Sequence, residues 1–244
     1  MPKKLLLTLL LVLFACNVSA CGIIDYFYLP PGEDTPQELF ENGNDAMREK
    51  DYMSAIEYYS KLKESFPFSP YAKEAEISLG DAYYLDGEYL LASETYKDFE
   101  SMHPRDEAVP YVLLQIANSN IKSYTSIDRP TTALVEAEAY LRRVIESYPG
   151  TEYAERASAL LEQTRRTMAE HELYLGDFFM RTGKYNAAWR RYTALADNFP
   201  DIGDLAAHAK EKAKEAYVKH LEFSAEQDKA AQETGIWKAF KEWL

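Results

Sequence analysis

Small apolar residues recur along this chain at a fixed spacing. Four alanines each lie twelve residues before a proline, in the pairs Ala55 and Pro67, Ala92 and Pro104, Ala137 and Pro149, and Ala188 and Pro200. Gly43 and Gly80 lie a further twelve residues before the first two alanines, so the whole pattern moves by 37 residues from the first copy to the second. A fixed period of about 20–50 residues is typical of repeat architectures. The pattern therefore predicts a stack of helical hairpins.

Each predicted hairpin has a small residue on each helix, where the two helices approach closely. These pairs are Gly43 and Ala55, Gly80 and Ala92, Ala117 and Ala137, and Gly176 and Ala188. Aromatic residues fill other apolar positions of the repeat, at Tyr83, Tyr96, Phe179 and Tyr192. A fifth, eroded copy is expected at Ala213 and Ala225, with no closing proline. Because the period slightly exceeds the roughly 34 residues of a tetratricopeptide repeat, we predict an all-α tetratricopeptide superhelix of four clear hairpins and a degenerate fifth.

The third hairpin has a longer turn than the others. Twenty residues instead of twelve separate Ala117 from Ala137, so the extra residues fall around Tyr124–Thr132. Extra length in a repeat usually maps to a loop on one face. Two interpretations stay open, because lengthening a surface loop costs little. The loop is either a tolerated insertion or a projecting partner contact with Asp128 and Arg129 at its tip.

The fourth hairpin begins with a lengthened helix. Pro149 lies 27 residues before Gly176, whereas the corresponding spacing elsewhere is 13. The excess equals about four helical turns, so one helix over about residues 151–181 keeps its buried face in register. We expect this helix to divide the body into an N-terminal half, residues 36–150 with repeats 1–3, and a C-terminal half, residues 151–234 with repeats 4 and 5.

The first residues read as a leader for export. Lys3 and Lys4 precede an apolar run that is too short to span a bilayer, and small residues follow it. The segment Val18-Ser19-Ala20-Cys21 resembles a bacterial lipobox, so residues 1–20 are expected to be a lipoprotein signal peptide and Cys21 to carry N-acyl and S-diacylglycerol groups. Cys16 is the alternative site, although bulky Phe14 fits its cleavage position poorly.

A plain secretory signal would leave one unpaired thiol in an oxidising compartment, and this favours lipidation. Residues 21–35 then form a lipidated, proline-rich and extended tether, and the folded body begins near Pro36. Gly22 follows the lipidated residue, and its resemblance to bacterial sorting signals implies the outer membrane.

The net charge and the lack of catalytic sequence motifs argue against several functions. The formal net charge is −13, which argues against nucleic acid as a partner and leaves the lipid anchor as the expected route to the membrane. His171-Glu172 begins a zinc-protease pattern, but Leu175 stands where the second histidine is required. The chain has no phosphate-binding glycine loop, nucleophile elbow or cysteine cluster. We expect no enzymatic activity, no metal and no cofactor other than the covalent lipid.

Polar residues form two candidate columns on the first helices of the hairpins. Asn44, Asp81, Asn118 and Asp177 directly follow the small residues, and Arg48, Leu85, Lys122 and Arg181 stand one turn further on. Because these helices line the inner surface of such a superhelix, a peptide-binding groove is predicted. Its candidate contacts are Asn44, Arg48, Asp81, Tyr84, Asn118 and Lys122, with the two cations suited to a chain-terminal carboxylate. The alternative is that these are ordinary solvated positions.

Two further segments are candidates for partner binding. Trp189-Arg190-Arg191 combines residue types typical of interface hot spots, although both arginines could instead pair with nearby carboxylates. The amphipathic tail, residues 235–244, places Trp237, Phe240 and Leu244 on one helical stripe. This stripe either caps the end of the array, which we favour, or docks on a partner.

The segments between the repeats resemble one family. They are Phe66–Ala72, Met102–Pro104, Ile127–Thr131, Ser147–Ala154 and Ala169–Tyr174. In this order they resemble the BamD family, tetratricopeptide lipoproteins of the outer membrane β-barrel assembly machinery, over about residues 36–202. The resemblance implies a scaffold on the periplasmic face of the outer membrane. It implies that the first half binds unfolded outer membrane proteins and the second half binds machinery subunits, with Arg191 the first candidate to contact the insertase BamA and with other lipoproteins of the complex as neighbours.

A second function is compatible with an anchored array. A periplasmic repeat lipoprotein could instead organise cell-wall enzymes or pilus biogenesis. The family-like segments between repeats and the long fourth-hairpin helix favour barrel assembly.

Overall fold

The computed structural model describes residues 34–243, and this part of the chain contains helices and turns but no strand. The helices are α3 (Pro36–Glu49), α4 (Tyr52–Ser65), α5 (Ala72–Asp86), α6 (Tyr89–Met102), α7 (Val109–Ser123), α8 (Thr132–Ser147), α9 (Glu152–Arg181), α10 (Tyr185–Asn198) and α11 (Gly203–Trp243). The predicted all-α class is confirmed. The predicted leader and Cys21 lie outside the described residues.

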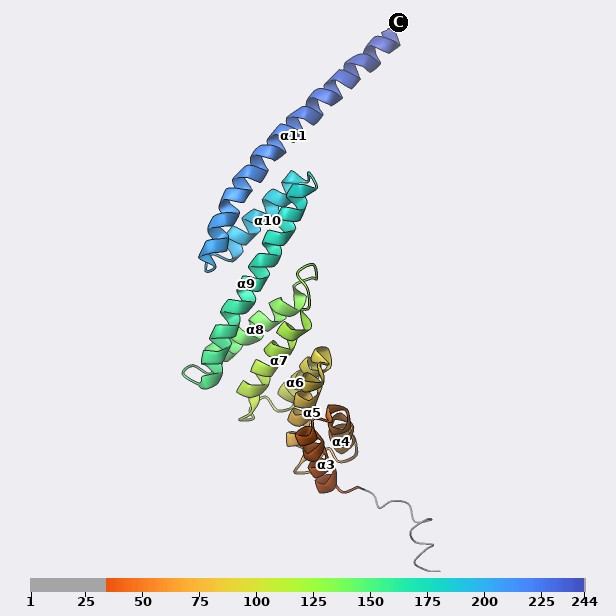
Figure 1. The fold of residues 1–244 in the computed structure, drawn as a ribbon, viewed down its shortest axis with the longest axis vertical. Coiled ribbons are helices and arrows are strands. Elements are labelled where there is room, and N and C mark those ends of the chain that lie inside the picture. Colours follow the sequence, from red (N-terminus) through yellow and green to blue (C-terminus); the bar gives the residue numbers. More distant parts are fainter. Residues whose placement is uncertain (1–33, 244) are drawn as a thin grey trace, which may run out of the picture.

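The helices stack in chain order into an elongated body. Each helix packs mainly against the helix before it and the helix after it, as expected of a repeat array. In Figure 1, α3 lies at one end of the long axis and the end of α11 at the other. No helix in residues 34–243 is long and apolar enough to cross a membrane.

The four closing helices α4, α6, α8 and α10 end in the same way. Their C-caps are Phe66, His103, Tyr148 and Phe199, and each cap donates its N–H to the carbonyl four residues earlier. A proline follows each cap and cannot continue the helix because it lacks an N–H. At the start of α3, the N-cap Thr35 and the third helical residue Glu38 form a capping box, and Pro36 is the first residue of the helix. The prolines that recur twelve residues after the alanines therefore mark the ends of α4, α6, α8 and α10.

Three of the four hairpins place a tyrosine ring directly over a glycine. Tyr59, Tyr96 and Tyr192 are fully buried and cover Gly43, Gly80 and Gly176. In the third hairpin the small residue is Ala117, and buried Leu141 takes the position that tyrosine has in the others. The small residues therefore match the size of the side chain that packs on them.

The long helix α9 serves two hairpins. It spans Glu152–Arg181, and Thr151 caps it by accepting a hydrogen bond from the Ala154 N–H. Its first half contributes Ala157 to the core of the third hairpin, and its second half places Gly176 under Tyr192 of α10. The predicted long helix is confirmed.

The predicted fifth hairpin is wrong. α11 runs without interruption past both Ala213 and Ala225. Ala213 is half-buried beside the core of the fourth hairpin, as a first helix requires, but Ala225 is exposed on the same helix. No glycine or proline lies between them, so nothing in this stretch turns the chain back.

The described end of the chain does not cap the array. Between Ala216 and residue 235 of α11 no residue is buried, and every residue from 225 to 235 is exposed. Beyond the body the helix continues outward instead of folding back onto it (Figure 1). The expectation that the tail closes the last face is therefore wrong, and a face of α11 stays open.

Candidate functional site

The first predicted polar column is occupied by the tyrosines of the hairpins. The Tyr59 hydroxyl donates to Asn44 Oδ1 at 2.7 Å. The Tyr96 hydroxyl donates to Asp81 Oδ1 at 2.5 Å, and the Tyr192 hydroxyl to Asp177 Oδ1 at 2.6 Å. Each acceptor lies fifteen residues before its donor, on the facing helix of the same hairpin. These acceptors stabilise buried phenols, a role that neither interpretation of the column anticipated.

Burial keeps these phenols protonated. It raises the pKa of Tyr59 to about 12, and it also raises the pKa values of Tyr96 and Tyr192. All three side chains are therefore neutral donors at physiological pH.

The column continues as a hydrogen-bonded chain across α5, α6 and α7. Besides Tyr96, the Tyr111 hydroxyl donates to Asp81 Oδ1 at 2.5 Å. Gln115 Nε2 donates to the Tyr111 hydroxyl at 3.1 Å, and Asn118 Nδ2 donates to Gln115 Oε1 at 2.8 Å. The structure thus brings the predicted contacts Asp81 and Asn118 into one network. Peptide binding at these residues stays a prediction.

The other predicted groove contacts remain more accessible. Arg48 pairs with Asp45 on its own helix, and its side chain is 74% exposed. Lys122 is exposed near the end of α7 and has no ion pair among residues 34–243. The ring of Tyr84 meets Tyr89 edge to face at 5.4 Å. Arg48 thus fits the alternative interpretation, in which these are solvated positions with an ion pair on the same helix. Lys122 has no such ion pair within the described residues.

The long turn of the third hairpin is held by a histidine. His171 of α9 is 7% exposed, and its Nδ1 lies 2.6 Å from the Ile127 carbonyl oxygen, so this nitrogen donates. Within the turn the Ser126 hydroxyl donates to Asp128 and lowers the pKa of that carboxyl group. Asp128 and Arg129 are both exposed. The predicted tip residues therefore lie at the surface of an anchored turn.

A small hollow lies between this turn and α9. It has a volume of about 240 Å³ and is lined by Ile121, Tyr124, Leu134, Gln163, Thr164 and Thr167. The buried Tyr124 hydroxyl has no hydrogen-bond partner in the described part of the chain.

The two arginines of the fourth hairpin differ in their surroundings. Arg191 Nη1 donates to both carboxylate oxygens of Glu172 at 3.2 Å, so the intramolecular alternative holds for Arg191. Arg190 is exposed and makes no ion pair within residues 34–243. Trp189 packs on Tyr217 of α11, with 5.1 Å between ring centroids. Arg190 is therefore the arginine available to a partner without breaking an existing pair.

A second arginine cluster was missed by the sequence analysis. Arg165 Nε donates to Asp201 Oδ2 at 2.7 Å, and its Nη1 donates to Glu138 Oε1 at 2.7 Å. Its Nη2 donates to the Asn198 carbonyl oxygen at 2.8 Å, and the guanidinium lies 5.0 Å from the centre of the Phe199 ring. Arg165 thus joins α8, α9 and the turn before α11.

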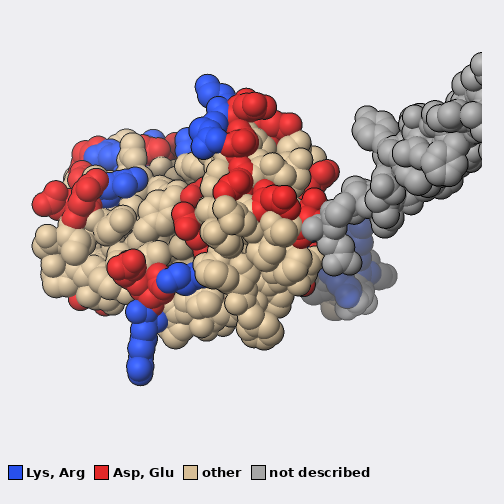
Figure 2. All heavy atoms as spheres, turned by 90° about the horizontal axis from the view of Figure 1, so that it is seen from below, with Lys and Arg blue, Asp and Glu red and all other residues tan. Residues whose placement is uncertain are grey.

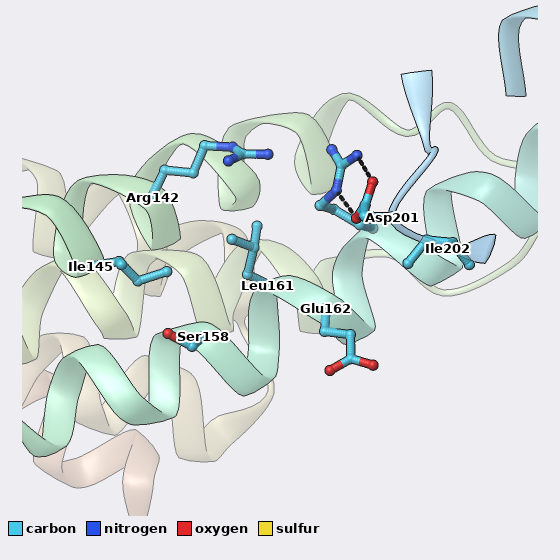
Figure 3. Close-up of a pocket in the computed structure, with 8 residues that line it drawn as sticks. Arg142, Ile145, Ser158, Leu161, Glu162, Asp201 and Ile202 are labelled. Carbon is cyan, nitrogen blue, oxygen red and sulfur yellow. Dashed lines mark hydrogen bonds and ion pairs between the residues drawn. The ribbon is translucent and has the colours of Figure 1, made fainter. Parts of the chain in front are cut away.

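The hydrogen bonds between Arg165 and Asp201 raise the pKa of Arg165 and lower that of Asp201. Arg165 and Asp201 line a hollow of about 490 Å³ together with the apolar side chains of Ile145 and Leu161. Figure 3 shows Asp201, Ile145 and Leu161 in this hollow. Little in the sequence indicated these ion pairs, because Glu138 and Asp201 lie 27 and 36 residues from Arg165 along the chain.

Without a fifth hairpin, an apolar surface remains open on α10 and α11. Its exposed α11 residues are Tyr217, Val218 and Leu221, between 43% and 53% exposed. A hollow of about 280 Å³, lined by Trp189 and Tyr217, adjoins it. Phe223 lies on another side of α11, where its ring meets Tyr185 beside a hollow of about 540 Å³. We call Trp189, Tyr217, Val218 and Leu221 the C-terminal apolar surface.

At the α3 end of the body, acidic and basic side chains are interspersed. Seen from the α3 end, acidic and basic side chains lie side by side and leave broad uncharged areas (Figure 2). No continuous basic field covers the described residues seen from this side (Figure 2).

Comparison with known proteins places the chain in a family. The model of the YfiO family, described as outer membrane lipoprotein, matches residues 32–233. The chain belongs to this family. The match covers all four hairpins of the YfiO-family chain and most of α11.

Several relatives of this YfiO-family chain are named outer membrane protein assembly factor BamD. The protein of Vibrio cholerae is 25% identical over 216 residues, which cover 84% of this chain and 86% of that relative. The protein of Neisseria meningitidis serogroup A is 25% identical over 207 residues, covering 81% and 78%. The protein of Caulobacter vibrioides is 25% identical over 191 residues, which cover 78% of this chain but 63% of that relative's length.

Solved structures similar to the chain include two tetratricopeptide domains. The TPR2AB domain of yeast Sti1 has a TM-score of 0.45 and 16% identity, and covers 78% of this chain and 72% of that structure. The TPR domain of Arabidopsis OM64 has a TM-score of 0.42 and 15% identity, and covers 52% and 94%.

Proposed function

We propose that this chain is a non-enzymatic scaffold in the assembly of outer membrane proteins. The observation that carries the proposal is the family match over residues 32–233, together with relatives whose name is outer membrane protein assembly factor BamD. A stack of hairpins with open surfaces offers docking sites for protein domains and extended chains. In this proposal the chain binds its partners and performs no bond chemistry.

The C-terminal apolar surface is the proposed docking site for a periplasmic domain of a BamA-type insertase. It stays open because α11 continues as one helix from Gly203 to Trp243 and does not fold back over it. Trp189 and Tyr217 supply aromatic anchors of the kind that dominate interfaces. Arg190, the residue after Trp189, supplies an exposed cation that makes no ion pair within residues 34–243. Arg191 can join the same contact if an acidic partner replaces Glu172.

The N-terminal half is the proposed site for unfolded outer membrane proteins. Arg48 and Lys122 are exposed cations on first helices of hairpins, and cations suit the carboxylate at the end of a client chain. The half-buried ring of Tyr84 offers a neighbouring apolar contact. Asp128 and Arg129, at the tip of the anchored turn, are proposed to meet another lipoprotein of the assembly complex.

Lipidation of Cys21 is the proposed attachment to the periplasmic face of the outer membrane. Its support is the lipobox-like Val18–Cys21 segment and the description of the family as outer membrane lipoproteins. Two or more acyl chains hold a protein stably on a bilayer.

Affinity purification from detergent-solubilised outer membranes tests this function. We expect a BamA-type insertase to co-purify with the wild-type chain. Leu221→Glu places a charge in the C-terminal apolar surface and should abolish this recovery. Leu90→Glu is the matched control, because Leu90 is also exposed but lies on α6. Recovery of cell-wall or pilus proteins in place of an insertase would contradict the proposal.

A further inference from the structure

The turn between α4 and α5 holds a phenylalanine in solvent. Phe68 is 99% exposed, whereas Phe66, two residues earlier, packs partly against the core formed by α3, α4 and α5. Pro67 and Pro70 restrict the backbone on both sides of Phe68, and the Ser69 N–H donates to the Phe66 carbonyl oxygen at 3.0 Å. The turn therefore presents the Phe68 ring in a fixed place, where binding costs little conformational entropy.

The Phe68 ring lies beside a hollow. The hollow has a volume of about 360 Å³ and is lined by Pro36 and the run Ser65–Pro70, which includes Phe68. Its volume falls within the range of about 300–1,000 Å³ that is typical of ligand pockets. None of the lining residues is charged, and the two serines are the only ones with a polar side chain. The hollow therefore suits an apolar occupant that brings no charge with it.

The chain enters the described structure at the rim of this hollow. Pro36, the first residue of α3, lines it, and Asp34, two residues earlier, pairs with Lys61 of α4. Lys61 lies one helical turn before Ser65, where the lining run begins. The ion pair therefore holds the entry of the chain against the same part of α4 that borders the hollow.

The segment that precedes Asp34 in the sequence has side chains that suit the hollow. Residues 26–29, Tyr-Phe-Tyr-Leu, are four consecutive large residues without a charge. Residues 30–32, Pro-Pro-Gly, follow them, and a Pro-Gly pair favours a turn. Leu29 is seven residues from Pro36, which gives a reach of at most about 25 Å. This length allows the four residues to return to a hollow that adjoins Pro36.

A separate protein fits the hollow less well. Stable protein interfaces involve about 20–30 residues on each side, whereas seven residues line this hollow. A segment joined to its site by a short linker meets that site at an effective concentration on the order of millimolar. Weak apolar contacts are therefore enough to keep such a segment bound.

We propose that residues 26–29 dock in this hollow and cover the ring of Phe68. Docking buries apolar surface on both the segment and the turn, and it shortens the free part of the tether to residues 22–25. With the proposed lipid on Cys21, this holds the N-terminal end of the array close to the bilayer. The docking itself rests neither on lipidation nor on the proposed function.

Photo-cross-linking in cells tests the docking directly. Phe68 is replaced by p-benzoylphenylalanine in the full chain, the cells are irradiated, and the cross-linked peptides are identified by mass spectrometry. We expect an intramolecular cross-link from position 68 to residues 26–29. The control carries the same probe in place of Leu90, which is also exposed but lies on α6, and should give no cross-link to this segment.

Protection from chymotrypsin, which cleaves after large apolar residues, measures how firmly the segment is held. Docking withholds residues 26–29 from the protease, and cleavage follows the undocked population. Phe68→Ser removes the ring and should accelerate cleavage within the segment about tenfold. Leu90→Ser is the matched control and should leave the rate unchanged. Circular dichroism verifies that both variants stay helical.

Three results would overturn the proposal. The first is the absence of a cross-link from position 68 to residues 26–29. The second is a cross-link from position 68 to lipid, to a second copy or to another protein in its place. The third is equal cleavage of Phe68→Ser and the parent chain. Normal recovery of the insertase by Leu221→Glu, with the cross-link retained, would contradict the proposed function and leave this docking in place.

Discussion

The ring of Tyr59 lies so close to Gly43 that a Cβ atom at position 43 would lie 2.5 Å from the Tyr59 Cε1 atom. The phenol hydroxyl then reaches Asn44, the residue after the glycine. The absence of a side chain at Gly43 and the ring of Tyr59 thus form one packing unit. The third hairpin replaces both members at once, with Ala117 and Leu141.

This relationship predicts the effect of adding one methyl group. Gly43→Ala should destabilise the chain by about 1–3 kcal/mol through overpacking, which outweighs the gain of about 1 kcal/mol in helix propensity. The free energy of unfolding, measured by urea denaturation, checks this value. Gly203→Ala is the control, since no atom lies within 4 Å of its added Cβ, and it should leave the stability unchanged or slightly higher.

A paired substitution tests the same unit further. Gly43→Ala combined with Tyr59→Leu reproduces the arrangement of the third hairpin. The double variant should be more stable than the sum of the two single effects predicts. Additive effects of the two changes would mean that the glycine and the ring are independent.

The raised pKa of Tyr59 predicts a dependence of stability on pH. An unfolded tyrosine ionises near pH 10, and Tyr59 in the folded chain near 12. Between these values the unfolded state releases a proton that the folded state retains, so the free energy of unfolding falls as the pH rises from about 10 to 12. Tyr59→Phe should show a shallower fall over this range in denaturation at each pH. An identical slope in both proteins would contradict the assignment.

Arg165 is expected to hold the turn between α10 and α11 in place. Arg165→Leu removes hydrogen bonds to two carboxylates and one carbonyl and should cost about 1–3 kcal/mol. Hydrogen exchange should accelerate in residues 198–204. Arg166→Leu is the control, because its pair with Asp204 is exposed and is worth less than about 1 kcal/mol. Equal exchange in the two variants would show that Arg165 has no special role.

Substitutions of Arg190 and Arg191 are expected to affect partner binding and stability differently. Arg190→Ala should weaken binding of an insertase domain without changing thermal stability, because Arg190 makes no ion pair in the described structure. Arg191→Ala frees Glu172 and should change both quantities. Isothermal titration calorimetry and thermal denaturation measure these effects. Unchanged affinity of Arg190→Ala would remove that residue from the interface.

The spacing of small residues and prolines was enough to predict the four hairpins, because close helix approach and helix termination are local demands. The long helix followed from its spacing for the same reason. The hydrogen bond from Tyr59 to Asn44 was missed, because it joins facing helices and depends on how the ring passes the glycine. The partners of Arg165 were missed because they come together only when α8, α9 and the turn between α10 and α11 pack against one another.

The prediction of a fifth hairpin failed for a different reason. Its small residues, Ala213 and Ala225, matched the repeat, but alanine is also the strongest helix former. Without a glycine or proline between them, the chain continues as α11. This departure leaves the C-terminal apolar surface open, and therefore it creates the site that we propose for the insertase.

The most direct test of the account is complementation after depletion of the protein. Folded, heat-modifiable outer membrane barrels are quantified in cells that express only the wild-type chain, Leu221→Glu or the control Leu90→Glu. The account predicts normal barrel levels with the wild-type chain and Leu90→Glu, and a severe loss with Leu221→Glu at equal protein abundance. Normal barrel levels in depleted cells, or with Leu221→Glu, would contradict it.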